Sequence, residues 1–200
     1  MFDQFNSSFQ LTNLESRESN QSILTAVEPY APGFSQLIGD YGGGTFESGL
    51  YRLHGSGDLM AWTESITAVF PRFANRLVCF AFDWLGRHFA LDRKRVVDGR
   101  MQVLLLEPGA GEAMQVPADL QAFHNVELVE YRNDALASDF FSRWIDSGGA
   151  PPAYNQYVGY KVPLFLGGSD DEQNLELSDM DVYWTICGQL LNSSRGESAS

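Results

Sequence analysis

The chain has few cysteines and few histidines, and each shortage excludes a class of site. Only two of its 200 residues are cysteine, Cys79 and Cys187, and both stand among apolar neighbours. Two thiols neither build a disulfide scaffold nor complete a zinc site, so we expect two buried, reduced cysteines. The three histidines, His54, His88 and His124, lie far apart in the sequence and share no metal-ligand spacing. We therefore expect no metal and no other cofactor.

Long apolar runs and an N-terminal targeting segment are also missing. No apolar run approaches the roughly 18 residues that a membrane-spanning helix needs. The first residues, MFDQFNSS, have neither the basic region nor the apolar region of a signal peptide. We expect a cytoplasmic protein that makes no contact with a membrane.

Lysine and arginine are scarce. Only 13 of them stand against 26 Asp and Glu, which gives a formal net charge of −13. The excess is concentrated in residues 101–200, where 4 basic residues face 15 acidic ones. Such a chain lacks the cations that neutralise phosphates, so we expect no direct binding of nucleic acid. It suits a basic protein partner, including one that itself binds nucleic acid; the alternative is that the charge only serves solubility.

What the chain does contain is a globular composition, 44% hydrophobic with 14 Phe, and clear strand and helix patterns. TFESGLYRLH, RLVCFAFD with RHFALD, and RMQVLLLEPGAGEAMQVP each predict a pair of strands joined by a turn. Apolar residues at helical spacing predict helices before and after these strands, including one helix over NDALASDFFSRWIDSGG. This order predicts an α+β fold with a central antiparallel sheet and flanking helices.

The stretch FAFDWLGRHFALD, residues 80–92, holds two aspartates, an arginine and a histidine within thirteen residues. Its turn chemistry predicts a hairpin that Asp83 and Arg87 close as an ion pair. This interpretation places the Phe and Leu side chains inward and the charges in water. The alternative is an enzyme in which Asp83 or Asp92 orients His88 as a general base. The stretch supplies neither a nucleophile nor a water site, so we assign no catalytic residue.

The most acidic segment is residues 167–184, GGSDDEQNLELSDMDVYW, which has six carboxylates and no cation. Its glycine and glutamate are not placed as in an EF-hand, so we expect no calcium site. One interpretation is a solvated loop, and the other is a surface that steers and binds a basic protein. The candidate partner-binding residues are Asp170, Asp171, Glu172, Glu176, Asp179 and Asp181. Further candidates, on the exposed side of the helix that contains Trp144, are Asp134, Asp139 and Asp146.

Five stretches resemble, in their order and in their amino-acid sequence, the bacterial immunity proteins that accompany type VI secretion DNase effectors. They are GTFESGLYRLH, FAFDWLGRHFALD, VLLLEPGAGEAMQVP, GYKVPLFLGG and NLELSDMDVYW. The resemblance covers most of residues 45–190 and implies an N-terminal module likened to the GAD domain, followed by a C-terminal immunity domain akin to the SUKH group. On this basis we expect a helical GAD-like region over 1–75, an immunity domain over 76–191 packed against it, and a flexible tail over 192–200.

The resemblance also implies a function. Proteins of this kind bind a cognate toxin, which here implies a non-enzymatic antitoxin that masks the active site or substrate groove of a basic nuclease effector. The acidic charge and the lack of a complete catalytic constellation agree with that role. Two alternatives stay open: a small-ligand-binding or scaffold protein with a pocket lined by Phe and Trp, and the enzyme that would use His88 with Asp83 and Asp92.

Overall fold

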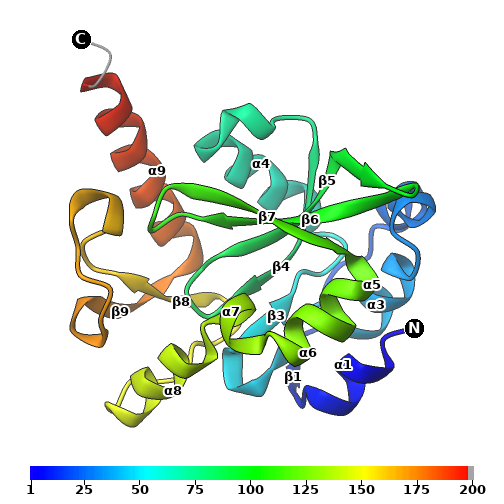
Figure 1. The fold of residues 1–200 in the computed structure, drawn as a ribbon, viewed down its shortest axis with the longest axis horizontal. Helices are drawn as coiled ribbons and strands as arrows, with labels where there is room; N and C mark the ends of the chain where they lie inside the picture. The colour runs from blue at the N-terminus through cyan, green and yellow to red at the C-terminus, as the bar shows by residue number, and fades with distance from the viewer. Residues whose placement is uncertain (198–200) are drawn as a thin grey trace.

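The computed structural model, which describes residues 1–197, is built on a seven-stranded sheet (Figure 1). The strands follow one another in chain order, and each is antiparallel to the next. They are β1 (Leu11–Leu14), β2 (Gly44–Phe46), β3 (Tyr51–Leu53), β4 (Leu77–Asp83), β5 (His88–Val97), β6 (Arg100–Glu107) and β7 (Glu112–Asp119). The predicted α+β fold with a central antiparallel sheet is confirmed.

Helices cover both faces of the sheet, which produces two apolar cores. Phe80 and Phe89 enter one core, while Cys79 and Phe82 enter the other. Phe80 and Phe82 are two residues apart, yet they face opposite cores because the register of β4 shifts between Cys79 and Ala81. The first core is covered by α1 (Asp3–Ser8), α2 (Gln21–Val27), α3 (Phe34–Tyr41) and the helical segment after β7. The second is covered by α4 (Leu59–Val69) and α9 (Met180–Glu197). Because both faces are covered, β4 is buried along its whole length.

The helical segment after β7 is interrupted where the sequence predicts one continuous helix. Its elements are α5 (Leu120–Ala122), the π-helical turn η4 (Phe123–Glu127), α6 (Leu128–Glu130), α7 (Arg132–Leu136) and α8 (Ser138–Asp146). The prediction of a single helix over NDALASDFFSRWIDSGG is wrong, because Ala137 has a left-handed φ of 48° and separates α7 from α8. At the end of α7, a carbonyl group accepts a hydrogen bond from a side chain and not from the backbone of a further helical turn. Trp84 Nε1 donates to the carbonyl oxygen of Leu136 at 2.9 Å.

The C-terminal part adds a small sheet and a long helix. β8 (Gln156–Tyr160) and β9 (Leu175–Asp179) pair in antiparallel fashion, and α9 follows β9 directly. Short 3₁₀ turns complete the chain: η1 (Glu28–Tyr30), η2 (Glu47–Gly49), η3 (Pro71–Phe73), η5 (Leu164–Leu166) and η6 (Glu172–Asn174). Residues 192–197, which we expected in the tail, continue α9, and the rest of the predicted tail, 198–200, lies outside the described residues.

The large sheet crosses the expected boundary between residues 75 and 76. Strands β1 to β3 come from the first predicted region and β4 to β7 from the second, and β3 pairs with β4 along its length. Both cysteines are buried free thiols, as predicted. Within residues 1–197, no helix combines the length and hydropathy that crossing a bilayer requires.

Candidate functional site

The hairpin turn between β4 and β5 has the predicted ion pair. Arg87 Nε donates to Asp83 Oδ2 at 2.6 Å, and Asp83 Oδ1 accepts from the backbone N–H groups of Leu85 and Arg87 at 3.0 Å each. The prediction that these charges lie in water is wrong, because Asp83 is 0% exposed and Arg87 7%. Burial raises the pKa of the Asp83 carboxyl, while the neighbouring Arg87 acts in the opposite direction. The pair is therefore a structural feature of the interior.

The turn is buried because distant segments pack over it. Trp84, in the middle of the turn, contacts Phe140 and Phe141 of α8 with ring centroids 5.3 and 5.2 Å apart. The backbone N–H of Val158 in β8 donates to the Trp84 carbonyl at 2.7 Å. These contacts join residues that lie far apart in the sequence, so local turn chemistry could not have predicted them.

His88 lies among aromatic rings and not beside a carboxylate. Its Nδ1 is 3.3 Å from Nε2 of His54, and its Nε2 is 2.5 Å from Oη of Tyr157. Burial lowers the pKa of both histidines well below the usual value. Asp83 is held by Arg87 as described, and Asp92 by Arg76, whose Nε donates to it at 2.8 Å. The enzyme interpretation therefore lacks the carboxylate–histidine contact that it requires.

Arg52 is a buried cation that sequence reasoning missed. It projects from β3 and donates to the carbonyl groups of Ala153 and Asp83, at 2.8 Å each, and also to that of Gln156. Its guanidinium carbon lies 4.6 Å from the centre of the Phe82 ring. Burial lowers its pKa to about 10, so it stays charged at neutral pH. Arg52 thus ties the loop before β8 to the large sheet.

The six acidic candidates do not form one loop. They are spread over the approach to η6, η6 itself, β9 and the start of α9. Asp170 accepts a hydrogen bond from Tyr160 Oη at 2.7 Å, and Asp171 caps η6 by accepting from the backbone of Gln173. Glu172 forms an ion pair with Arg143 of α8. These three carboxylates have structural partners in addition to any role in binding.

The remaining three carboxylates are exposed. Asp179 accepts from the backbone N–H groups of Asp181 and Val182, at 3.0 and 3.4 Å, and so caps the N-terminus of α9. Among the residues that the structure describes, the side chains of Glu176 and Asp181 have no hydrogen-bond or ion-pair partner. These two carboxylates are therefore the ones most available to a partner.

The further candidates Asp134, Asp139 and Asp146 are exposed, as predicted, but they do not share one helix. Asp134 belongs to α7, whereas Asp139 lies in the first turn of α8 and Asp146 at its last residue. They therefore cannot present one continuous acidic helix face.

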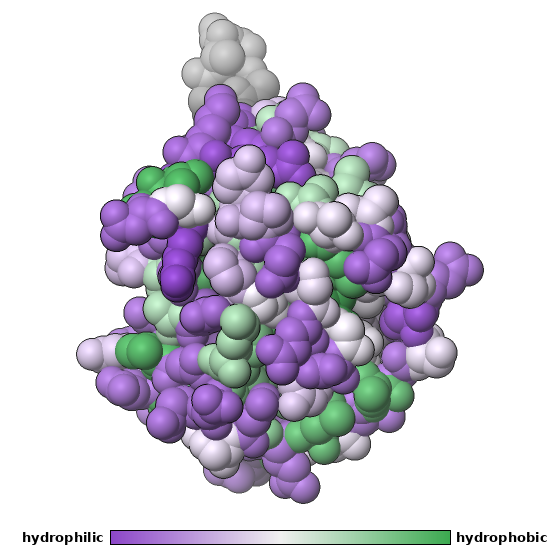
Figure 2. Space-filling model, turned by 90° about the vertical axis from the view of Figure 1, so that its right-hand side faces the viewer, coloured by the Kyte–Doolittle hydropathy of each residue, from purple (hydrophilic) through white to green (hydrophobic). Residues whose placement is uncertain are grey.

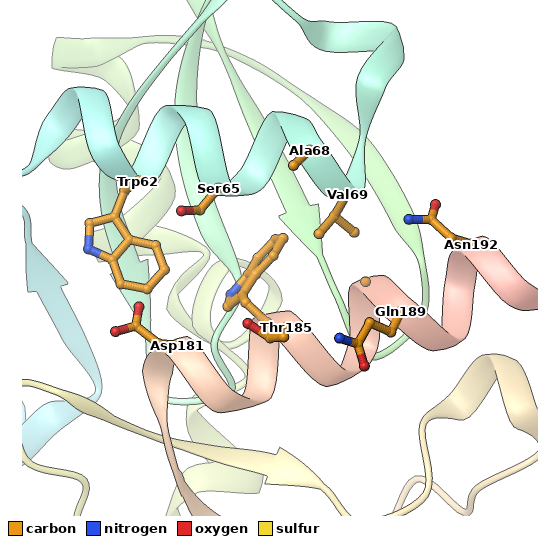
Figure 3. A pocket seen from close by; sticks show the side chains of 10 residues that line it. Trp62, Ser65, Ala68, Val69, Asp181, Thr185, Gln189 and Asn192 are labelled. Atoms are coloured by element: carbon orange, nitrogen blue, oxygen red, sulfur yellow. The ribbon is translucent and has the colours of Figure 1, made fainter.

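A groove lies between α4 and α9 (Figure 3). It consists of two adjoining hollows of about 290 and 310 Å³, which share the lining residues Trp62, Ser65 and Asp181. The first hollow continues along the two helices toward Asn192, and the second continues toward Arg17. Figure 3 shows Trp62 projecting from α4 toward Asp181 on α9. This combination of an indole ring and a carboxylate was not predicted from the sequence.

The groove is acidic. Its lining includes three carboxylates, those of Asp58, Asp179 and Asp181, against the single cation of Arg17. Arg17 already lies 3.8 Å from Asp58 and stacks on the Tyr154 ring at 4.3 Å. The negative charge of Asp179 and Asp181 is therefore not neutralised by a neighbouring side chain of the described part of the chain.

Comparison with known proteins finds a family match in the C-terminal part of the chain. Residues 119–191 match the family model described as "T6SS immunity protein Tdi1, C-terminal". The resemblance to type VI secretion immunity proteins is thereby confirmed, and the matched segment contains all six acidic candidates. The crystal structure of Atu4351 from Agrobacterium tumefaciens has a similar fold, with a TM-score of 0.66 at 13% identity, over 94% of this chain and 89% of that one. The chain matches no curated protein.

Proposed function

We propose that this chain, whose residues 119–191 match the C-terminal domain of a type VI secretion immunity protein, neutralises a basic nuclease effector in the cytoplasm. It acts by binding and without catalysis, and it covers the active site or the substrate groove of the effector. The observation that carries the proposal is the charge of the matched segment. Residues 119–191 hold 12 Asp and Glu against 3 Lys and Arg, a net charge of −9.

This charge complements that of a nuclease. An enzyme that binds nucleic acid presents cations to the phosphates, so its substrate groove is a positive surface. Opposite potentials accelerate the encounter of two proteins and determine how they orient. An acidic inhibitor that occupies the groove excludes the nucleic acid without any chemical step.

The proposed contact comprises the six acidic candidates, from Asp170 to Asp181. Glu176 and Asp181 are exposed and engaged by no neighbour of the described chain, so a partner's cations can reach them without breaking an internal contact. Asp171 and Glu172 are half-buried and hold η6 and α8 in place, so we expect them to support the surface as well as to contact the effector.

The outer surface agrees with a charge-guided contact. Figure 2 shows one side of the molecule, mostly hydrophilic, with its hydrophobic residues in separate small groups. The large aromatic side chains are mainly inside: the largest fully buried ones include Trp84, Tyr51 and Tyr157. A small-ligand pocket lined by Phe and Trp is not what the groove between α4 and α9 offers, because Trp62 and Trp184 line it but no Phe of the described residues does.

Co-expression tests the proposal. If the adjacent gene encodes the effector, as the proposal expects, its product should kill a host cell when produced alone, and the chain should restore growth. Reversing the charge at the two free carboxylates, in the double variant Glu176→Lys with Asp181→Lys, should weaken binding to the effector by about tenfold or more at low salt. The matched control is Asp3→Lys with Asp40→Lys, an equal charge change on the exposed residues of α1 and α3. Unchanged rescue and affinity in the first variant would contradict the acidic contact, and failure of the natural chain to bind would contradict the function.

A further inference from the structure

We propose that the groove between α4 and α9 receives an arginine side chain of the effector, stacked on Trp62 and paired with Asp181. The inference rests on the proposed function for the identity of the partner. It adds the chemistry of one contact, which involves a helix outside the segment that matches the immunity family.

The first argument is the fixed position of the Trp62 ring. Trp62 is only partly buried, and its ring stacks on His54 with centroids 5.5 Å apart and an interplanar angle of 20°. It also contacts the ring of His88 at 5.1 Å. These two rings are held in the core, so Trp62 cannot turn away without losing both contacts. The groove therefore presents an indole ring that loses little side-chain entropy when a ligand stacks on it.

The second argument is the free hydrogen-bonding capacity beside that ring. Among the described residues, neither the Trp62 indole N–H nor the Asp181 carboxylate has a partner, and both line the two hollows. A cation placed between them gains a charge-assisted hydrogen bond and the attraction of the ring. Asp179, one of the other carboxylates of the groove, adds to the negative potential while it caps α9.

The third argument is shape, which favours arginine over lysine. Ser65, Ala68 and Gly188 line the hollow beside Trp62, and none of them fills it. A Cβ at Gly188 would approach Cγ2 of Val69 to 2.7 Å, so the glycine lets the two helices lie close together. The hollow is thus a slot between helices, closed on one side by an indole. A planar guanidinium stacks in such a slot and binds a carboxylate with two donors, whereas an ammonium group is compact and strongly hydrated.

The groove can be tested without the effector. Adding L-argininamide to the ¹⁵N-labelled protein should move the indole N–H resonance of Trp62, which Trp62→Phe identifies by its loss. Asp181→Asn should weaken this titration, and Asp40→Asn, an equal change on α3, should not. L-lysinamide should move the resonance less than L-argininamide at equal concentration. A Trp62 resonance that does not move, or that moves equally in Asp181→Asn, would overturn the inference.

A second experiment uses the effector encoded beside the gene. Ser65→Trp fills the groove and should weaken binding by about tenfold or more, because a central pocket contributes most of the affinity of an interface. Met60→Trp adds the same ring to an exposed position of α4 that lines neither hollow, and should leave binding unchanged. Full affinity in Ser65→Trp would overturn the groove contact and leave the proposed function standing. If the natural chain binds no effector, the proposed function fails, and the argininamide titration still decides whether the groove takes a guanidinium.

Discussion

His54 and His88 stack in the interior of the protein, with ring centroids 5.1 Å apart and Nε2 of His54 lying 3.3 Å from Nδ1 of His88. Neither ring is exposed, and the pair lies beneath Trp62, which lines the groove between α4 and α9. Two imidazoles at this distance share one hydrogen bond only if at least one of them is neutral. The stack therefore links the protonation of the core to the stability of the fold.

The first prediction is that acid weakens the fold before the exposed carboxylates titrate. Burial lowers the pKa of His54 and His88 well below the usual value, and that of His124 to about 4. In the unfolded chain these groups take up protons near pH 6.5, so below this pH the unfolded state binds more protons than the folded state. The neutral histidines contribute fully to the free energy of unfolding above about pH 7. As the pH falls, this contribution decreases by up to about 1.4 kcal/mol per pH unit for each histidine.

Urea unfolding at a series of pH values measures this effect. The free energy of unfolding should fall steadily between about pH 7 and about pH 5, a range above the ordinary pKa values of Asp and Glu. A free energy that is constant over this range would show that the three histidines are not buried in their neutral forms.

The second prediction concerns Arg52. Arg52→Met removes the guanidinium that donates to the carbonyl groups of Ala153, Tyr154, Gln156 and Asp83. We expect a loss of about 2 kcal/mol or more in the free energy of unfolding, because a single hydrogen bond to a charged group contributes about 1.5–3 kcal/mol and several are lost together. Arg72→Met, at an exposed position, should change it by no more than about 0.5 kcal/mol. Equal effects in the two variants would mean that Arg52 does not hold the loop before β8.

The third prediction compares two glycines. A Cβ at Gly159 in β8 would lie 2.3 Å from Cε2 of Tyr183, a rigid ring of α9, so Gly159→Ala must push the helix from the small sheet. We expect a destabilisation of about 1–3 kcal/mol, as for other overpacked cores. A Cβ at Gly39 in α3 would meet nothing within 4 Å, and Gly39→Ala should stabilise the helix by up to about 1 kcal/mol. Thermal unfolding of the two variants should shift in opposite directions; shifts of the same sign would contradict this packing of β8 against α9.

The hairpins of the sheet could be predicted from the sequence because their signals are local. The stretch FAFDWLGRHFALD contains its own alternation and its own turn residues, and the structure has β4 and β5 where the pattern places them. The burial of Asp83 and Arg87 could not be predicted in this way, since it depends on α8 and β8 packing over the turn. The break at Ala137 has the same origin: Trp84 binds the carbonyl that ends α7 from a distance of 52 residues in the sequence.

The candidate site was partly predictable for a related reason. Six carboxylates in one short segment are visible in any reading of the sequence, and the exposure of Glu176, Asp179 and Asp181 confirms that part of the segment faces solvent. The sequence does not show which carboxylates are engaged by the fold, because Arg143 and Tyr160 reach Glu172 and Asp170 only in three dimensions. Nor does it show that α4 places Trp62 beside Asp181.

The measurement that tests the account most directly is a calorimetric titration of the protein with the product of the adjacent gene, which the proposed function expects to be the effector. It should be made at about 50 mM and at about 500 mM NaCl, which strongly screens exposed charges. The account predicts tight binding at low salt that weakens markedly at high salt, as expected for an acidic surface that covers a basic one. Tight binding that does not change with salt would contradict the acidic contact. No binding at both salt concentrations would contradict the immunity function itself.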